Sequence, residues 1–531
     1  MSDAKDWSDD IAEIKTRRKL AKGQGGADAI DKHHAKGRLT VRERIDLAVD
    51  ADSFAEVGEG AGAPEFDEDG NQIGFTPPNY VLGFGRMNGR PVVLGGEDFT
   101  IKGGSPTPSG LRKSVYSEQL ALDYQLPLVR LLEGGGGSVG GAAANQKGSG
   151  KGPPPRPSGG DPVFTDPRFL SITQVLGQVP VASAALGPVA GFPAARLAAS
   201  HFSVMTRKTA QVLVAGPQVV SRALGRELTK EELGGAKVHL KAGTVDNVAK
   251  DEEDAINQVR RFLSYLPANI HELAPRIESG DSPDRMDEAL QTLIPRDRRQ
   301  PYDARAMVKA IVDYDSWFEM TRKYGPGQIT GLARLNGQPV GILANDCHYY
   351  AGSMTADGAQ KVRRFVDLCD TFHLPIISFV DEPGFMIGPD AEQASTIRYG
   401  ASAIAAVMQA KVPWASVIVR KVFGVAGAAH FGRKCYTLAW PSAEMGALPV
   451  EGGVAIAFGK LIAQADDPEA KRAELEAMLA ARQSPFPRAE AFGFHELIDP
   501  AETRPYLCGW IDRVTPQLSR DLGPREYYYR P

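Results

Sequence analysis

The residues best placed to do chemistry lie in two turns rich in glycine and alanine, and the group that these turns offer is the backbone amide. One has the sequence ASAALGPVAGFPAARLAA (residues 182–199) and the other ASVIVRKVFGVAGAAHFG (415–432). Each runs from an apolar predicted strand toward a predicted helix. At the start of a helix, N–H groups lack intrahelical partners and lie at the positive end of the helix dipole. Two such groups aimed at one point form an oxyanion hole, which stabilises an enolate or a tetrahedral oxyanion.

Side-chain catalytic motifs are not found. The chain has no G-x-S-x-G motif and no G-x-x-x-x-G-K-[ST] motif. Its 4 cysteines form no CxxC pair and its 9 histidines no HExxH motif, which disfavours a disulfide framework and a metal site with ligands close in sequence. Small residues allow a substrate carbonyl to approach the main chain. Chemistry at the two turns can therefore rest on the backbone.

The two turns belong to two halves of the chain that share a pattern. RMNGRPV (86–92) is repeated as RLNGQPV (334–340), and the longer segments 85–105 and 333–353 are identical at 8 of 21 positions. An Asn-Gly pair between valine-rich stretches predicts a hairpin. The two segments therefore predict the same pair of strands in each half.

Two further matches follow the same order along the chain. QLPLVRLLEGGG (125–136) matches HLPIISFVDEPG (373–384) at the same spacing, and VDADSFAE (49–56) matches VDYDSWFE (312–319) at 5 of 8 positions. Three matches in one order indicate a duplicated domain. Because predicted strands alternate with predicted helices in each half, we expect an α/β fold.

The length of 531 residues is too great for one core and suggests at least two domains. We predict an N-terminal helical extension (1–30), a first domain (31–285) and a second domain (286–531). The charged, proline-containing stretch 276–305 is the natural linker. Residues 140–161 have low complexity, and we expect a mobile surface loop there, within the first domain.

The composition is that of an ordinary globular protein. The formal net charge is −4 and the pI is about 6.2, which gives no electrostatic reason to expect nucleic acid or an anionic membrane as a partner. The first residues are charged throughout and have no apolar stretch, so we expect no secretory signal. The longest uncharged stretch, 171–195, is interrupted by glycines and prolines and predicts no membrane span. We expect a cytoplasmic protein.

Several longer segments resemble one protein family. They are KGRLTVRERIDLAVD (36–50), EDFTIKGGS (97–105), LTKEELGGAKVH (228–239), CDTFHLPIISFVDEPGFMIG (369–388), YTLAWPSAEMGA (436–447) and IDPAETRP (498–505). Over residues 30–505 the chain resembles the carboxyltransferase (beta) subunits of biotin-dependent acyl-CoA carboxylases, of the propionyl-CoA and methylcrotonyl-CoA carboxylase type. The resemblance implies two duplicated crotonase-like (ClpP/crotonase) domains, each a β-β-α superhelical fold. It also implies an active site between the N-terminal domain of one subunit and the C-terminal domain of its dimer mate.

The reaction that the resemblance implies moves a carboxyl group from N1 of carboxybiotin to the α-carbon of an acyl-CoA thioester. Negative charge develops on the biotin ureido oxygen and on the thioester oxygen, so the reaction can use two oxyanion holes. Carried over by position, the backbone N–H groups of Gly191 and Phe192 form one hole, and those of Val425 and Ala426 form the other. The α-proton can pass to the biotin nitrogen, so no side-chain base is required.

The resemblance also places acyl-CoA- and biotin-binding surfaces on the glycine-rich turns. The residues concerned are Gly103, Gly104, Gly135 and Gly136 in the first half, and Asn345, Gly352, Gly384, Phe385 and Ala428 in the second. Two positions depart from the family pattern. Phe192 stands where much of the family has a second glycine, and Ala428 stands where propionyl-type enzymes have an acid that lines the acyl pocket. We therefore expect an acyl pocket that is altered or enlarged.

The resemblance implies partners as well. The chain has no Met-Lys-Met biotinylation site and no ATP-grasp glycine-rich loop, so a biotin carboxylase and a biotin carrier must lie on a partner, and the family assembles as hexamers, trimers of dimers. No metal is expected in this subunit. The three tyrosines Tyr527, Tyr528 and Tyr529 favour a packed C-terminal tail.

Three alternative functions stay open. A biotin-dependent decarboxylase or transcarboxylase would use the same chemistry. The duplication argues against a hydratase or isomerase of the crotonase type, and the Phe192 departure leaves room for a non-catalytic scaffold. Sequence alone does not identify the acyl chain, or the half that binds biotin.

Overall fold

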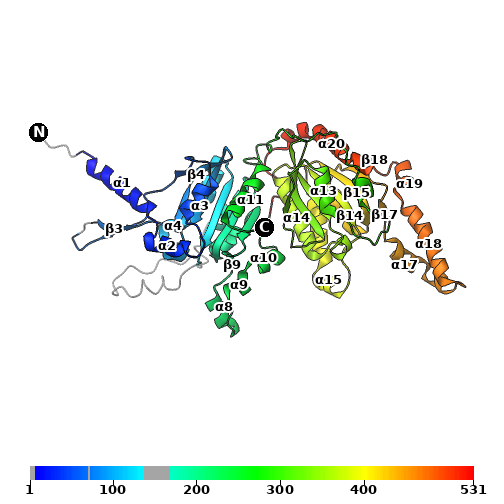
Figure 1. The fold of residues 1–531 in the computed structure, drawn as a ribbon, viewed down its shortest axis with the longest axis horizontal. Coiled ribbons are helices and arrows are strands. Elements are labelled where there is room, and N and C mark those ends of the chain that lie inside the picture. Colours follow the sequence, from blue (N-terminus) through cyan, green and yellow to red (C-terminus); the bar gives the residue numbers. More distant parts are fainter. Residues whose placement is uncertain (1–5, 70–71, 137–167) are drawn as a thin grey trace. The chain divides into compact units, whose positions relative to one another are not determined.

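The computed structural model describes residues 6–69, 72–136 and 168–531 and divides into two compact units (Figure 1). Met1–Leu263 together with Pro531 make up the first unit, and Ser264–Arg530 make up the second. The division falls at Leu263, ahead of the charged stretch 276–305 that the sequence suggests as a linker. The predicted loop at 140–161 lies outside the described residues.

The first unit is built on one mixed sheet. Its strand order is β1-β4-β5-β6-β7-β8-β10, and β9 pairs with β7 beyond this path. The strands β4 to β8 occupy the centre and are parallel except for the antiparallel pair β4–β5. The bounds of the strands are β1 (Ala55–Glu56), β4 (Tyr80–Met87), β5 (Arg90–Glu97), β6 (Leu128–Gly134), β7 (Val181–Ala190), β8 (Phe202–Thr206), β9 (Gln211–Leu213) and β10 (Asn247–Ala249), with β2 (Ala63–Phe66) and β3 (Gln72–Thr76) forming a separate ribbon.

The second unit repeats this topology. Its strand order is β11-β12-β13-β14-β15-β16-β18, and β17 pairs with β15 beyond the path. The duplication and the α/β fold predicted from the sequence are thereby confirmed. The bounds of the strands are β11 (Phe318–Met320), β12 (Gln328–Leu335), β13 (Gln338–Asn345), β14 (Ile376–Glu382), β15 (Trp414–Phe423), β16 (Tyr436–Ala439), β17 (Glu444–Gly446) and β18 (Glu496–Leu497).

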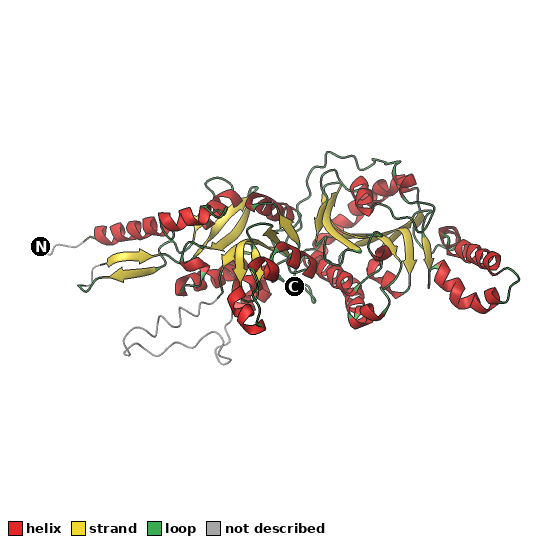
Figure 2. Cartoon of the chain, turned by 60° about the horizontal axis from the view of Figure 1, so that its bottom comes forward, coloured by secondary structure: helices red, strands yellow, loops and turns green. Residues whose placement is uncertain are grey.

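Helices lie beside the strands in each unit (Figure 2). The first unit contains α1 (Ser8–Lys22), α2 (Ala27–His34), α3 (Val41–Ala48), η1 (Lys102–Gly104), α4 (Pro108–Tyr124), α6 (Arg168–Val175), α7 (Phe192–Ala198), α8 (Pro217–Leu224), α9 (Lys230–Gly234), α10 (Ala236–Ala242) and α11 (Glu252–Ser264). The second contains α12 (Leu290–Leu293), α13 (Ala304–Ile311), η3 (Tyr350–Gly352), α14 (Ala356–Thr371), α15 (Pro389–Gln393), α16 (Thr396–Gln409), η4 (Val425–His430), α17 (Val450–Ala463), α18 (Pro468–Gln483), α19 (Pro485–Glu490), η5 (Pro500–Glu502), α20 (Thr503–Leu518) and η6 (Ser519–Asp521).

The repeated sequence segments form the same hairpin in both units. The turn between β4 and β5 has φ 51° at Asn88 and 76° at Gly89, and both N–H groups donate to the Asp50 carboxylate at 3.0 and 2.7 Å. The turn between β12 and β13 repeats these features, with Asp313 as the acceptor at 3.0 and 2.7 Å. Positive φ at both central residues is what an Asn-Gly hairpin turn requires. The upstream V-D-x-D-S match therefore supplies the carboxylate that fixes the turn.

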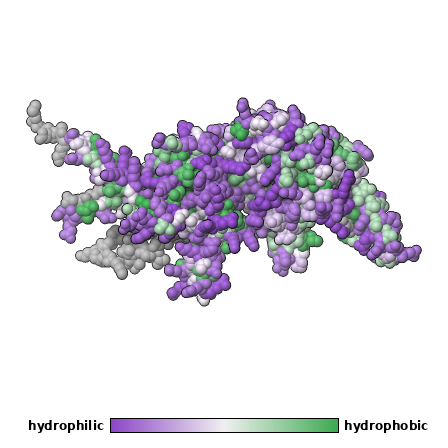
Figure 3. All heavy atoms as spheres, in the orientation of Figure 1, coloured by the Kyte–Doolittle hydropathy of each residue, from purple (hydrophilic) through white to green (hydrophobic). Residues whose placement is uncertain are grey.

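Both units bury an apolar core between the sheet and its helices. In the second unit, Met307 and Ile311 of α13 and Ile511 of α20 pack against strand residues such as Phe379 and Val417, all buried. Hydrophilic side chains cover much of the face that Figure 3 shows. In the described part of the chain, no helix combines the length and the apolar composition needed to cross a lipid bilayer.

Candidate active site

Two glycine-rich turns of the first unit meet at one edge of its sheet. Because β5 and β6 are parallel, their carboxyl ends lie side by side. Gly103 (φ 62°) and Gly104 (φ 69°) follow β5, and the Gly135 N–H donates to the carbonyl of Gly103 at 3.4 Å. A Cβ on Gly104 would lie 2.7 Å from the Glu133 carbonyl oxygen, which is closer than atoms can approach. The two turns therefore touch through their backbones, and glycine is required at Gly104.

The third turn of the first unit, at Gly191, lies against the same group. A Cβ on Gly191 would lie 3.2 Å from the Cα of Gly136. Gly191 has φ 63°, and its N–H donates to the Leu213 carbonyl at 3.2 Å, which extends the pairing of β7 with β9. The Gly191 amide is thus committed to the sheet, and the donor role predicted for it would require this hydrogen bond to open. Phe192 follows as the first residue of α7.

The Phe192 ring has a defined place within the first unit. It meets the Phe169 ring edge-on, with centroids 5.9 Å apart, and the Arg196 guanidinium lies 5.9 Å from its centroid. The side chain is half-buried. The structure therefore gives this departure from the family pattern a packing role beside α6 and α7.

The corresponding turn of the second unit offers a different set of amides. Val181 at the start of β7 pairs with Leu128, and Trp414 at the start of β15 pairs with Ile376 in the same register. Gly424, which follows β15, therefore matches Gly191; it has φ 63°, and its N–H donates to the Gly446 carbonyl at 3.4 Å.

This equivalence aligns Phe192 with Val425, and Pro193 with Ala426. Val425 and Ala426 are the first two residues of η4, so their N–H groups have no acceptor within that helical turn. Val425 is 65% exposed and Ala426 is fully buried. Proline has no N–H group, so Pro193 cannot supply the amide that Ala426 supplies. The two halves therefore differ by one donor at this turn.

Asn345 and Gly352 lie together at the carboxyl end of β13. The Asn345 side chain, fully buried, donates to the Gly352 carbonyl at 3.2 Å and to Glu382 at 3.1 Å, and its oxygen accepts the Asp381 N–H at 3.0 Å. All three are contacts with other residues of the same unit. The structure therefore places Asn345 behind the turn at Gly352, with its polar atoms used in positioning that turn.

The turn after β14 brings Gly384 and Phe385 to the same edge. Gly384 has φ 128°, and its carbonyl accepts the Met354 N–H at 3.1 Å. Phe385 packs on Gly400, where an added Cβ would lie 2.3 Å from the ring. Ala428 of η4 is half-buried. The second-half residues predicted from the sequence are thus distributed over the ends of β13, β14 and β15.

The acids that enter the two matching turns are paired with arginines. Glu133 is fully buried and contacts Arg38, Arg44 and His33. Burial would raise the pKa of Glu133, but the hydrogen bond from His33 and the charges of Arg44 and Arg38 bring it below its usual value. Asp381 is equally buried and accepts from Arg420 at 2.9 Å. Neither carboxylate is placed to act as a catalytic base.

Sequence reasoning missed the buried charged groups beneath these turns. In the first unit, Arg196 donates to Glu118 at 3.0 Å and Arg130 donates to it at 2.8 Å. In the second, Glu382 and His430 approach to 3.4 Å. These residues follow no local motif, and only the hydrophobicity of the strands around them signals that they are buried.

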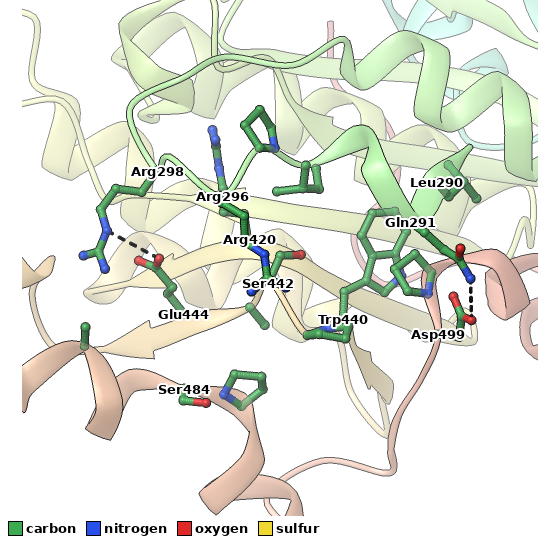
Figure 4. A pocket seen from close by; sticks show the side chains of 17 residues that line it. Leu290, Gln291, Arg296, Arg298, Arg420, Trp440, Ser442, Glu444, Ser484 and Asp499 are labelled. Atoms are coloured by element: carbon green, nitrogen blue, oxygen red, sulfur yellow. Dashed lines mark hydrogen bonds and ion pairs between the residues drawn. The ribbon is translucent and has the colours of Figure 1, made fainter. Parts of the chain in front are cut away.

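Two cavities lie away from the predicted residues. Figure 4 shows one of about 560 Å³ in the second unit, where Arg298 pairs with Glu444 at 3.7 Å and Gln291 donates to Asp499 at 2.7 Å. The other, of about 840 Å³, lies in the first unit beside α4 and α6. None of the predicted site residues lines either cavity. Within the described ranges, no three His, Cys, Asp or Glu side chains are grouped so as to hold a metal ion.

Comparison with known proteins gives one consistent family. Residues 32–512 match the carboxyl transferase domain. The chain is 33% identical over 502 residues to the propionyl-CoA carboxylase carboxyltransferase subunit of Haloferax mediterranei, covering 93% of this chain and 94% of that protein. It is 33% identical over 495 residues to the methylmalonyl-CoA decarboxylase subunit alpha of Veillonella parvula, covering 92% of each.

A solved structure extends the likeness to three dimensions. Transcarboxylase 12S, determined as a hexamer with methylmalonyl-coenzyme A and methylmalonic acid bound, superimposes with a TM-score of 0.85 at 29% identity, covering 97% of both chains.

Proposed function

This chain belongs to the carboxyl transferase domain family, and from that premise we propose that it is the carboxyltransferase subunit of a biotin-dependent acyl-CoA carboxylase. Its substrates are carboxybiotin on a partner protein and an acyl-CoA thioester. The observation that carries the proposal is the pair of glycine turns at equivalent strand ends, each followed by helical N–H groups. The carboxyl group would pass from N1 of carboxybiotin to the α-carbon of the thioester, and the α-proton displaced there would pass to N1 of biotin.

The residues of this chain stabilise the negative charge that develops on oxygen. In the second unit, the N–H groups of Val425 and Ala426, which have no acceptor within η4 because they begin it, form one oxyanion hole. In the first unit, the Phe192 N–H at the start of α7 serves the other oxygen, with Gly191 joining if its bond to Leu213 opens. A preorganised donor in a water-excluded site is typically worth about 3–4 kcal/mol of barrier.

The glycines around these turns allow the ligands to approach the backbone. Gly103, Gly104 and Gly135 of the first unit, and Gly352 and Gly384 of the second, lie in turns at the neighbouring strand ends and carry no side chains. The paired state of Glu133 and Asp381 supports a reaction in which the proton passes between the substrates. A side-chain base is then unnecessary.

The subunit works within a larger assembly. We propose a biotin carboxylase and a biotin carrier protein as partners, a hexamer like that of transcarboxylase 12S, and a cytoplasmic location. The acyl pocket differs from that of propionyl-type enzymes, because Ala428 offers no acid. Light scattering of the purified protein tests the hexamer, and copurification with streptavidin-reactive proteins tests the partners.

The reaction is tested with free biotin as a surrogate acceptor. The purified protein, methylmalonyl-CoA or malonyl-CoA, and biotin are mixed, and the decarboxylated acyl-CoA is quantified by liquid chromatography. Biotin-dependent formation of propionyl-CoA or acetyl-CoA is the expected result. No turnover with any carboxylated acyl-CoA would favour a scaffold.

A second candidate is supported by the relative from Veillonella parvula, which is named a decarboxylase subunit. This subunit would then catalyse the reverse half-reaction, in which the carboxyl group moves from the carboxylated thioester to biotin. Reconstitution with the partner proteins separates the two functions. Carboxylation that requires ATP and bicarbonate identifies a carboxylase, and its absence with an active half-reaction identifies a decarboxylase or transcarboxylase.

A further inference from the structure

We propose that Glu382 is a positioning residue whose buried carboxylate holds together the three turns of the second-unit site, including the turn that carries Val425 and Ala426. This inference rests on the proposed function, because it concerns the geometry of the oxyanion hole assigned there. Glu382 ends β14 and is fully buried, so it cannot itself reach a ligand from this position.

The Glu382 carboxylate contacts groups in four different segments of the second unit. Its Oε1 accepts the Gly384 N–H at 3.0 Å. Its Oε2 accepts from the side-chain amides of Gln328 at 3.2 Å and Asn345 at 3.1 Å, and lies 3.4 Å from Nε2 of His430. One side chain therefore links the start of β12, the end of β13, the turn after β14 and the end of η4.

Two of these partners extend the network to the turn at Gly352. The same amides of Gln328 and Asn345 donate to the Gly352 carbonyl, at 3.1 and 3.2 Å. A planar amide that must satisfy two acceptors has little freedom to move. A displacement of the Glu382 carboxylate would therefore release Gly352 and Gly384 together.

His430 connects the carboxylate to the oxyanion turn. It is the last residue of η4 and fully buried. Its Nδ1 lies 2.8 Å from the Ser378 hydroxyl, and its carbonyl accepts from Trp414 at 2.9 Å and Ser416 at 2.6 Å. Both the ring and the main chain of His430 are thus anchored to β14 and β15. Because η4 is only six residues long and four of them are buried, anchoring His430 at its end restricts the direction in which the Val425 and Ala426 amides at its start can point.

The burial of both side chains supports the pairing of Glu382 with His430. Among the described residues, His430 is the one side chain that forms an ion-pair contact with Glu382. A buried carboxylate is costly unless it is paired and hydrogen-bonded, and the ring of His430 lies between the two polar groups, with Nε2 3.4 Å from Glu382 and Nδ1 2.8 Å from the Ser378 hydroxyl. Ser378, His430 and Glu382 are all fully buried, so they do not contact a ligand and act by fixing the positions of the turns.

The first unit anchors its turn differently. Gly134 stands at the position that matches Glu382, since Leu128 and Ile376 occupy the same register. There the buried Arg196 of α7 donates to Glu118 at 3.0 Å and to Ser117 at 2.9 Å, beneath the turn at Gly191. Both halves thus place a buried charged group under the glycine turn, but the Glu382–His430 pair belongs to the second half alone.

The test compares E382Q with a matched buried carboxylate. Asp370 is also buried, accepts the Lys411 and Val412 N–H groups at 2.7 and 3.2 Å, and contacts Arg525, but it touches none of the site turns. Full-length E382Q and D370N are assayed with methylmalonyl-CoA and free biotin. We expect kcat to fall on the order of 10²-fold in E382Q, as for a misplacement of about 1 Å, with KM nearly unchanged. D370N should lose thermal stability and keep its kcat.

Conservative replacement at His430 gives a second readout. The side-chain amide of H430Q can still donate to Glu382, whereas H430L cannot, so H430Q should recover much of the kcat that H430L loses. If E382Q does not fold, S378A replaces it: a lower kcat at unchanged KM supports the inference, and an unchanged kcat overturns it.

The outcomes separate this inference from the proposed function. Wild-type kcat in folded E382Q, or an equal fall of kcat in D370N, overturns the positioning role. V425P, which deletes a proposed donor, reports on the hole itself. Full activity of V425P refutes the hole whatever E382Q does, and an inactive V425P beside a fully active E382Q leaves the hole intact and refutes the role of Glu382.

Discussion

Replacing Val425 with proline removes one proposed hole donor with little disturbance of the fold. Proline lacks the N–H group and is favoured at the first position of a helical turn. Val425 holds that position in η4, and its side chain is 65% exposed. The preceding Gly424 has ψ −163°, an extended value that tolerates a following proline. We therefore expect V425P to unfold within a few degrees of the wild-type protein.

The kinetic effect should be large. Loss of one oxyanion donor typically costs about 10²–10³ in kcat, or about 2.7–4 kcal/mol. The matched control is V425A, which removes both γ-carbons of the side chain but keeps the amide, and which should retain near wild-type kcat. Initial rates of propionyl-CoA formation from methylmalonyl-CoA and free biotin measure both variants.

The comparison has a clear refuting result. If folded V425P turns over as fast as V425A, the Val425 amide does not stabilise an oxyanion. A426P is a less clean probe, because Ala426 is fully buried and added ring atoms in a packed site cost about 1–3 kcal/mol. The backbone at this position should nevertheless accept a proline, since Pro193 holds the matching position in the first unit. Loss of activity in V425P and A426P together, with V425A active, would support the two-donor hole.

Three further predictions concern other parts of the chain. A428D should restore an acid to the second-half turn and raise the kcat/KM ratio of propionyl-CoA over longer acyl-CoAs, by roughly tenfold if one methylene-sized pocket is closed; an unchanged ratio in acyl-CoA profiling contradicts a pocket role. F192A should lower the melting temperature through loss of its contacts with Phe169 and Arg196, while kcat is kept because the amide remains; a fall in kcat without destabilisation would count against this separation. Burial, with the charge of Arg525, lowers the pKa of His373 from 6.5 to about 4. The stability that the neutral ring contributes is therefore complete above pH 6.5 and is lost as the pH falls toward 4. H373Q should flatten the dependence of the unfolding free energy on pH in that window, by about 3 kcal/mol; equal pH profiles for the two proteins would refute it.

The features predictable from sequence are those that local pattern determines. Asn88–Gly89 and its copy predict hairpins, and the first aspartate of each V-D-x-D-S match accepts from both amides of the turn in its own half. Strands that alternate with helices likewise predict the sheets. These signals involve neighbours in sequence or a direct repeat, so they survive without knowledge of the packing.

The state of each amide could not be predicted, because it depends on distant pairing. The Gly191 N–H donates to Leu213 because β9 pairs with the end of β7, and no local sequence pattern predicts that contact. Glu382 is similar: in the sequence it stands beside Asp381 as one of two acids before a proline, yet one pairs with Arg420 and the other with His430. Long-range geometry assigns such roles.

The difference between Pro193 and Ala426 bears on how the duplicated halves share the reaction. If both halves had kept two consecutive amides after the turn glycine, either could serve either oxyanion equally. Because Pro193 has no N–H, the first half offers Phe192 alone unless Gly191 releases Leu213, whereas the second offers Val425 and Ala426 from a turn anchored by Glu382 and His430. The oxygen that needs the stronger, preorganised stabilisation is therefore best served by the second half. A V425P variant that is impaired far more than F192P would bear this out, since both substitutions delete the amide of the first residue after the turn glycine.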